Sequence, residues 1–230
     1  MQLFYIDKIS DKIILNKSES KHILKILRKK KNDIIFFTNG KGFLFEAIIT
    51  KADVKNCILK VLNKTAKTKQ RNYHLHIGIA PTKNIERFEW FLEKATEIGI
   101  DEITPLICER SERKIIKLER LNKILISSIK QSLQYQLPKI NKMISFKDFV
   151  IKDYNQKKLI AHCGNDKKLP LISLKNKNNY LILIGPEGDF SDSEIKLAKE
   201  NNYTPISLGD NRLRTETAGI VATNTINLNN

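Results

Sequence analysis

Two segments near the end of the chain combine glycine with charged side chains in a pattern that suits ligand binding. The first, Gly185-Pro186-Glu187-Gly188-Asp189-Phe190, follows an apolar run, and the second, Leu208–Gly219, contains two arginines, a glutamate and two threonines. Glycine lets a backbone approach a ligand closely, and the amides at the start of a helix face incoming polar groups. Neither segment matches the GxGxxG or P-loop pattern, which disfavours a standard dinucleotide or nucleotide-phosphate site. Ordinary capped loops have a similar composition, so both interpretations stay open at this point.

The elements around these segments alternate between strand-like and helical runs from Tyr73 onward, which predicts an α/β fold with a largely parallel sheet. Ligands of such sheets bind beyond the carboxyl ends of the strands, where both segments lie. Gly99 is expected to end the helix over 84–98, and Ser191 with Glu194 is expected to form a capping box before the helix over 192–201. The expected strands are His74–Ala80, Glu102–Ile107, Lys158–His162, Tyr180–Ile184 and Pro205–Leu208; the expected helices are 84–98, 117–136 (with Leu118, Leu121, Leu125, Ile129 and Leu133 on one stripe), 192–201 and 215–228.

The first part of the chain is rich in short strands instead. A helix is expected after Ser18 as its N-cap, and the turn Asn39–Gly42 predicts a hairpin, because Asn-Gly tolerates positive φ. Residues 63–72 are almost free of apolar side chains and are interpreted as a linker. The predicted domains are therefore 1–70 and 71–230. The expected strands of the first domain are Leu3–Ile6, Lys12–Leu15, Asp33–Thr38, Gly42–Lys51 and Asn56–Leu62.

Length and composition exclude several classes of protein. The 230 residues suffice for a core without disulfides, and the three cysteines are scattered and odd in number, which excludes a disulfide scaffold and a standard zinc site. No apolar run is long enough to span a membrane, and the first ten residues do not look like a secretory signal. We expect a soluble cytoplasmic protein with no metal and no membrane partner.

The charge of the chain favours a polyanionic partner. Lys and Arg number 41 against 25 Asp and Glu, a net charge of +16. Basic residues cluster in 25–31 and 64–71, and such clusters bind nucleic acid by displacing counterions. A genome with biased base composition would also enrich Lys, so the excess does not by itself prove RNA binding.

Several motifs resemble those of the RsmE family of the SPOUT superfamily. The most specific are GPEGDFSDSE at 185–194 and LGDNRLRTETAG at 208–219. EKATEIGI at 93–100, ERSERK at 109–114, the run 130–138 and the basic segment HILKILRKK at 22–30 with Asn39–Gly42 also resemble family motifs, in the same order. The resemblance therefore covers nearly the whole chain.

This resemblance implies an enzyme that methylates uridine N3 in small-subunit (16S) ribosomal RNA with S-adenosylmethionine, leaving S-adenosylhomocysteine. It also implies a PUA-like β-barrel in the first domain, a carboxyl-terminal trefoil knot in the SPOUT domain, and a homodimer. The substrate would be naked small-subunit RNA or the assembled small subunit.

The same resemblance implies site residues. The cofactor would be held mainly through backbone groups, and uridine, which carries a proton on N3, would need a base or a charge that stabilises its anion. Arg214 is the expected catalytic cation, and Glu187 or Glu216 the expected base; alternatively Arg214 and Glu216 pair, and Glu187 binds only the ribose. The expected cofactor-binding residues are His162, Ile184, Gly185, Pro186, Gly188, Leu208, Gly209, Asn211, Leu213, Thr217 and Ala218. The expected RNA-binding residues are Arg28, Lys29, Lys30, Lys83, Arg110 and Arg113.

Three residues depart from the family pattern. Asp189 stands where a second glycine is usual, Gln134 where arginine is frequent, and Arg212 where an apolar residue is common. With Asp at 189 the loop could have a different backbone conformation from the family's, although Asp tolerates unusual φ better than most residues. The alternatives are a SPOUT enzyme acting on another RNA position, a non-catalytic RNA-binding assembly factor, which would bind RNA without the cofactor, and a small-molecule enzyme.

Overall fold

The computed structural model describes residues 1–67, 69, 71–174 and 179–229. It forms two compact units: Met1–Gln70 with Ile129–Leu137, and Arg71–Ser128 with Pro138–Asn230. Nothing in the sequence pattern indicated that Ile129–Leu137 belongs with the first unit. Each unit has its own sheet and its own hydrophobic core, so each is described by itself.

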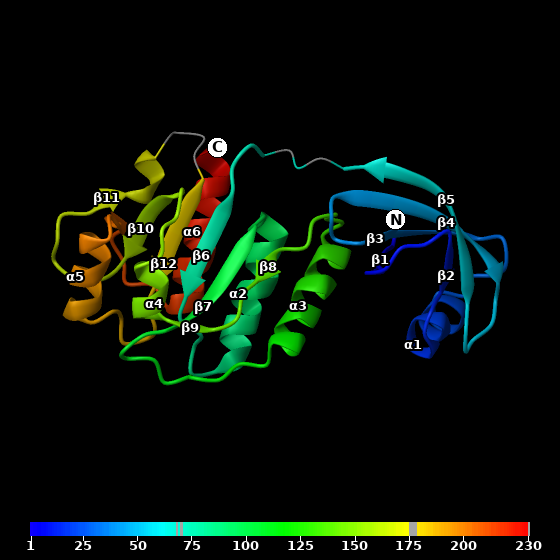
Figure 1. Cartoon of the computed structure of the whole chain (residues 1–230), viewed down its shortest axis with the longest axis horizontal. Coiled ribbons are helices and arrows are strands. Elements are labelled where there is room, and N and C mark those ends of the chain that lie inside the picture. Colours follow the sequence, from blue (N-terminus) through cyan, green and yellow to red (C-terminus); the bar gives the residue numbers. More distant parts are fainter. Residues whose placement is uncertain (68, 70, 175–178, 230) are drawn as a thin grey trace. The chain divides into compact units, whose positions relative to one another are not determined.

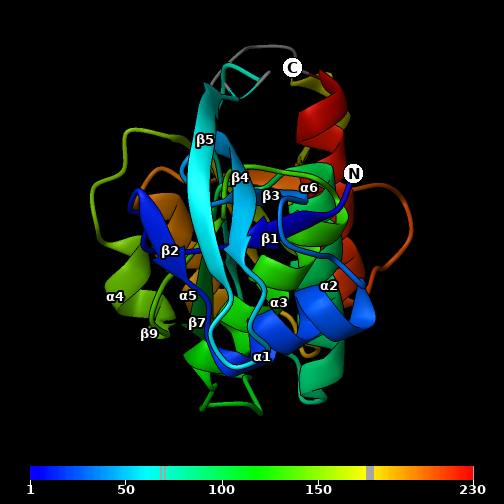
Figure 2. The same ribbon diagram turned by 90° about the vertical axis from the view of Figure 1, so that its right-hand side faces the viewer.

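The first unit is built on one curled sheet with the strand order β1-β3-β4-β5-β2 (Figure 2). In this sheet β1 runs parallel to β3, and the other neighbouring pairs are antiparallel. Phe37 and Phe45 stack in its core with ring centroids 5.0 Å apart. The strands are β1 (Leu3–Tyr5), β2 (Lys12–Ile14), β3 (Ile34–Thr38), β4 (Phe43–Lys51) and β5 (Ile58–Ala66).

The hairpin expected at Asn39–Gly42 is present between β3 and β4, with φ of 72° at Gly40 and 81° at Gly42. Segment 129–137 adds to this turn, because Gly42 N donates to Tyr135 O at 2.8 Å and Leu137 N donates to Gly40 O at 2.9 Å. These backbone bonds explain why a piece of chain so distant in sequence belongs to the first unit.

The second unit is a parallel sheet with the order β11-β13-β10-β12-β6-β7-β8, and β9 also pairs with β7 (Figure 1). Helices α2 and α6 pack together and α6 contacts β6 and β12, whereas α4 packs on α5 and β7. The α/β class is thus confirmed. The strands are β6 (Leu75–Ile79), β7 (Glu102–Ile107), β8 (Lys139–Ile140), β9 (Ile144–Ser145), β10 (Lys157–Ala161), β11 (Leu169–Pro170), β12 (Tyr180–Ile184) and β13 (Thr204–Ser207). The helices are α2 (Ile85–Ile98), α3 (Leu118–Gln131), α4 (Phe146–Val150), α5 (Asp192–Glu200) and α6 (Thr215–Asn229), with a 3₁₀ turn at Leu171–Ser173.

Two of the predicted helix ends are confirmed by their capping geometry. Gly99 has a φ of 120° at the end of α2, and its N–H donates to Ala95 O. Ser191 accepts from Glu194 N while the Glu194 side chain accepts from Ser191 N, which completes the capping box of α5. The second oxygen of Glu194 also accepts from Glu109 N at 2.9 Å, so this cap ties α5 to the loop after β7.

Three local predictions are wrong. The first helix, α1 (Lys17–Lys21), is capped by Asn16 rather than Ser18, and continues as a π-helical turn over His22–Ile26. The expected linker begins too early, because β5 continues to Ala66, and two of its residues, 68 and 70, lie outside the described residues. Helix α3 ends at Gln131 instead of continuing to 136.

Candidate active site

The carboxyl ends of three neighbouring strands of the second unit lie level with one another. Ala161 at the end of β10 is paired with Ile184 at the end of β12 and with Ile206 near the end of β13. The loops that follow these strands therefore meet at one edge of the sheet, and they enclose a cavity of about 580 Å³. This is the location expected for a ligand site of a parallel sheet.

Most of the predicted site residues line this cavity. Those on its wall are His162, Ile184, Gly185, Pro186, Glu187, Leu208, Gly209, Asn211, Leu213, Arg214 and Ala218. Three others lie beside it without lining it: Gly188, Glu216 and Thr217. Gly188 has a packing role instead, because a Cβ there would lie 3.3 Å from Cβ of Arg110.

Several lining residues were not singled out from the sequence. Arg87 comes from α2, about a hundred residues before the loops, and no local motif marks it. Lys168, in the loop after β10, was not expected either, nor were Ala161, Ile206 and Ser207 at the strand ends. The wall also contains Cys163, next to His162, and four residues of the two segments expected to bind a ligand: Asp189, Asp210, Arg212 and Thr215. The basic side chains Arg87, Lys168, Arg212 and Arg214 give the wall a strong positive component.

The segments 185–190 and 208–219 are held together by a buried hydrogen bond. Thr215 Oγ1 donates to Gly185 O at 3.0 Å, which joins the loop after β12 to the start of α6. A Cβ on Gly185 would lie 3.1 Å from Phe190 N, so glycine is needed for this tight approach of the loop to itself. At Gly209 the φ of 130° requires glycine, and a Cβ there would meet open space.

Asp189 adopts the backbone conformation that glycine usually provides. Its φ is 63°, in the left-handed region, where Asp is one of the few tolerated residues. Its carboxylate is also used: Oδ2 accepts from Cys163 N at 2.7 Å, and Oδ1 accepts from Phe190 N at 2.8 Å. This departure from the family pattern therefore preserves the turn and adds a link between the loops after β10 and β12.

His162 presents a buried and unpaired nitrogen in the cavity wall. Its Nδ1 accepts from Gly164 N at 3.1 Å, which leaves the proton of the neutral ring on Nε2. Nε2 is buried without a hydrogen-bond partner and lies 3.7 Å from Asp166 Oδ2. Burial lowers the pKa of His162, so the ring is neutral at pH 7. The unsatisfied Nε2 donor lies next to loops that contain glycine and several apolar residues. This combination fits a bound nucleoside such as the adenosyl group expected from the resemblance.

The two candidate bases are engaged in other interactions. Glu187 Oε1 accepts from Lys83 N at 2.9 Å, and the Lys83 ammonium pairs with Glu112 at 2.8 Å, which raises the pKa of Lys83. Glu216 is buried, and its Oε1 lies 4.0 Å from Nε of Arg87. The alternative pairing of Glu216 with Arg214 is not found, and within the described chain the Arg214 guanidinium makes no hydrogen bond or ion pair.

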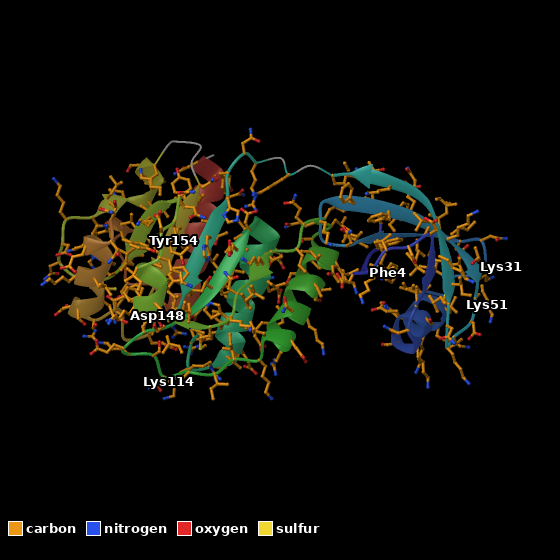
Figure 3. All side chains as sticks on the ribbon, viewed as in Figure 1. Phe4, Lys31, Lys51, Lys114, Asp148 and Tyr154 are labelled. Carbon is orange, nitrogen blue, oxygen red and sulfur yellow. The ribbon has the colours of Figure 1, made fainter. Side chains whose placement is uncertain are left out.

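The expected RNA-binding residues form two different groups. Arg28 and Lys30 are exposed on the first unit, as are Lys31 and Lys51 (Figure 3). On the second unit, Arg113 donates to Thr82 O at 2.9 Å and to Lys83 O at 2.5 Å, and Arg110 donates to Gly188 O at 2.8 Å. These two arginines therefore brace the loops around the cavity.

Neither a metal-binding cluster nor a membrane-spanning helix is found in the part of the chain that the structure describes. Its residues contain no group of three or more His, Cys, Asp or Glu side chains that could hold a metal ion. They also contain no helix that is both long and apolar enough to cross a membrane.

Comparison with known proteins gives matches along most of the chain. Residues 69–227 match the family model of an RNA methyltransferase domain, and residues 15–62 match that of an RNA methyltransferase PUA domain. The ribosomal RNA small subunit methyltransferase E of Buchnera aphidicola is 32% identical over 228 residues, covering 93% of this chain and 89% of that protein.

Solved structures agree with this result. A probable rRNA-methyltransferase from Porphyromonas gingivalis is 40% identical, with a TM-score of 0.93 and coverage of 98% of this chain and 97% of that one. A ribosomal RNA small subunit methyltransferase E from Neisseria gonorrhoeae, bound to S-adenosyl methionine, is 25% identical, with a TM-score of 0.85 and coverage of 97% and 95%.

Proposed function

Because this chain belongs to the ribosomal RNA small subunit methyltransferase E family, we propose that it methylates N3 of a uridine in small-subunit (16S) ribosomal RNA with S-adenosylmethionine as donor. The family expected from the GPEG and RTETA segments is confirmed, and the fold is of the SPOUT type with a PUA-like domain before it. The observation that carries the proposal is the cavity at the carboxyl ends of β10, β12 and β13, whose loops are these two segments and the segment after His162.

S-Adenosylmethionine would lie in this cavity and supply an electrophilic methyl group. Backbone groups around Gly185, Leu208 and Leu213 would hold it, with His162 donating through Nε2. The wall combines glycine, apolar side chains and one unpaired donor, which suits the adenosyl part of the molecule. Gly188 and Thr217 would support these loops from outside the cavity wall.

The chemistry that remains for the protein is to make uridine N3 nucleophilic. N3 would lose its proton to water and attack the methyl group that the bound cofactor supplies, and the electrons of the S–CH₃ bond would stay on sulfur. Arg214 would stabilise the uridine anion through a carbonyl oxygen, because its guanidinium lines the cavity without another partner among the described residues. Orientation of the two reactants in line would supply much of the rate.

The two units would divide the work. Residues 1–70 would bind RNA through Arg28, Lys29 and Lys30, and residues 71–230 would bind the cofactor and carry the knot. The order β13-β10-β12-β6, with α6 returning to pack on β6 and α2, supports a trefoil path at the carboxyl end. Lys83, Arg110 and Arg113 would contact phosphates at the cavity rim while bracing it. Phosphate contacts set affinity rather than choice of base.

The protein would act as a homodimer in the cytoplasm, where small subunits are assembled. Light scattering tests this proposal, because a dimer has twice the 26.6 kDa mass of the single chain.

Methyl transfer tests the activity. Purified protein, labelled S-adenosylmethionine, and either naked small-subunit RNA or small subunits from cells lacking the modification are incubated, and nucleosides are identified by mass spectrometry. 3-Methyluridine at one site is the expected product. Label in another nucleoside would change the target, and cofactor-independent RNA binding without transfer would favour the assembly factor.

A further inference from the structure

Arg87 and Glu216 form an ion pair beside the cavity that the proposed mechanism does not use. Arg87 projects from α2 into the cavity wall, and its side chain is 43% exposed. Glu216, in the first turn of α6, has a side chain only 9% exposed and does not line the cavity. Their closest atoms, Arg87 Nε and Glu216 Oε1, are 4.0 Å apart. The buried carboxylate of Glu216 thus lies behind the accessible guanidinium of Arg87.

The position of Glu216 couples its carboxylate to Arg87. A carboxylate in the first turn of a helix is stabilised by the helix dipole. Its Oε2 is buried without a hydrogen-bond partner, and a buried charge is costly unless an opposite charge accompanies it. Arg87 is the cation that the structure places beside it. Glu216 therefore holds the Nε side of this guanidinium.

The other side of the Arg87 guanidinium remains available to a ligand. Within the described chain no hydrogen bond occupies its two terminal nitrogens. These nitrogens form a planar pair of donors, a geometry that suits oxygen atoms of a base or a carboxylate. Arg87 and Arg214 come from different elements and line the same cavity.

We propose that Arg87 is a second catalytic cation, which donates to a carbonyl oxygen of the target uridine as N3 loses its proton to solvent, and that Glu216 is the positioning residue that orients it. This inference rests on the proposed function and assigns its uridine subsite. When N3 loses its proton, the resulting negative charge is delocalised onto the two carbonyl oxygens of uracil. Two guanidinium groups can therefore stabilise it together. Preorganised donors at such oxygens stabilise the transition state more than the ground state.

Two other roles for the pair make different predictions. If Arg87 binds the carboxylate of the cofactor, its loss weakens cofactor affinity and leaves the rate at saturation unchanged. If Glu216 is the general base, its loss abolishes turnover whether or not Arg87 is present. Kinetics of variants at the two positions separate these cases.

The first experiment uses R87Q, R87K and E216Q in the full-length protein. We expect R87Q to lower kcat about 10- to 100-fold with less than a twofold change in cofactor Kd, measured by calorimetry. R87K keeps the charge without the planar fork and should recover part of the rate, which also covers the case in which R87Q does not fold. E216Q should lower kcat less than R87Q. The double variant should be no slower than R87Q alone, because Glu216 acts through Arg87.

A second Arg–Glu pair that involves α2 provides a matched control. Arg120 on α3 pairs with Glu89 on α2, with Nε and Oε1 2.5 Å apart, and neither residue lines the cavity. R120Q removes an arginine of the same kind from an Arg–Glu pair and should leave kcat and cofactor Kd unchanged.

The second experiment replaces uridine in the RNA by 5-fluorouridine, whose N3 proton is more acidic. If Arg87 stabilises the anion, the rate ratio between wild type and R87Q must shrink on this substrate. A structural role for Arg87 would leave the ratio unchanged, and that result would overturn the inference. An R87Q variant with normal kcat and weakened cofactor binding would also overturn it, as would a double variant much slower than R87Q.

Failure of the proposed function gives a different result. A folded wild-type protein that transfers no methyl group to either RNA substrate would refute the uridine activity itself, and the assignment of Arg87 with it. An active wild type with an R87Q variant of equal rate would refute only the assignment.

Discussion

Replacement of Asp189 separates the two tasks that this residue performs in the cavity wall. Asp189 holds a φ of 63° and accepts a hydrogen bond from Cys163 N at 2.7 Å. D189G keeps the turn and loses the bond, D189N keeps both, and D189A loses the bond while forcing alanine into the left-handed region. The three variants therefore form a matched series.

The expected losses of stability follow from these two terms. A hydrogen bond to a charged acceptor contributes about 1.5–3 kcal/mol, and the lower end applies to the half-buried Asp189. Left-handed backbone costs alanine about 1–2 kcal/mol, whereas Asp189 offsets this cost with the local hydrogen bond from Phe190 N to its Oδ1. We expect D189A to destabilise the protein by about 3 kcal/mol, which lowers Tm by roughly 6–12 °C, and D189G by about half as much. D189N should lose less than about 1 kcal/mol.

Urea unfolding measures these differences, and Cys163 provides a local readout. Burial and, after it, the negative charge of Asp189 raise the pKa of the Cys163 thiol. Cys163 is exposed whereas Cys57 and Cys108 are buried, so a thiol reagent labels Cys163 first. D189N removes the charge and should shift the pH profile of labelling to lower pH.

Three results would refute this account of Asp189. Equal stability of D189A and D189G would show that backbone strain does not matter here. A D189N variant as unstable as D189A would show that the hydrogen bond and the turn are not what Asp provides. An unchanged labelling profile in D189N would show that the carboxylate does not act on Cys163.

Three further predictions test other parts of the molecule. Burial lowers the pKa of His76 to about 4, so the unfolded chain binds more protons than the folded protein between pH 4 and 6.5. The free energy of unfolding, measured with urea, should therefore fall by about 3 kcal/mol as the pH falls through this window. The fall should be smaller in H76Q. G219A should destabilise by about 1–2 kcal/mol although alanine favours helices, because its Cβ would lie 2.6 Å from the buried Phe91 ring; a stabilised G219A would contradict this packing. Arg28 has a φ of 55°, so R28G should raise stability by about 1 kcal/mol while lowering RNA affinity, and the slope of log affinity against log salt should fall by about one. An unchanged salt slope would remove Arg28 from the RNA surface.

Regular elements with side-chain periodicity were predictable from the sequence, and elements defined by backbone pairing were not. The strand Tyr180–Ile184 is apolar throughout and was placed correctly, because a central parallel strand is buried on both faces. Residues Asn63–Ala66 are exposed and have no large apolar side chain, yet they pair with β4 through the backbone. A pairing of this kind leaves no hydrophobic pattern, so the linker was expected too early.

The end of α3 shows a second limit of pattern reasoning. The apolar stripe of Leu121, Leu125 and Ile129 continues to Leu133 in sequence, but Leu133 has a φ of 54° and is 40% exposed. Gln134 N donates to Ile129 O, the six-to-one bond of a Schellman motif. Leucine occupies the position that glycine usually marks, so the sequence carried no stop signal.

The candidate site was predictable where it depends on loops that follow strands. Ligands bind at the carboxyl ends of parallel strands, and this rule points to the loops after Ile184 and Ser207 from the sequence alone. Arg87 could not be found in this way, because it lies on a helix and reaches the cavity through the packing of α2 against α6. Such a residue is visible only when the tertiary contacts are known.

The acids around the cavity favour a mechanism that depends on cations. Asp189 accepts from Cys163 N, Glu187 accepts from Lys83 N, and Glu216 lies against Arg87, so each of these carboxylates already has a partner. Asp210, the other acid of the described cavity wall, is exposed to water. Arg214, by contrast, faces the cavity with its guanidinium free among the described residues. The arrangement is suited to stabilising a uridine anion whose proton is lost to water, and less suited to removing that proton with a buried carboxylate.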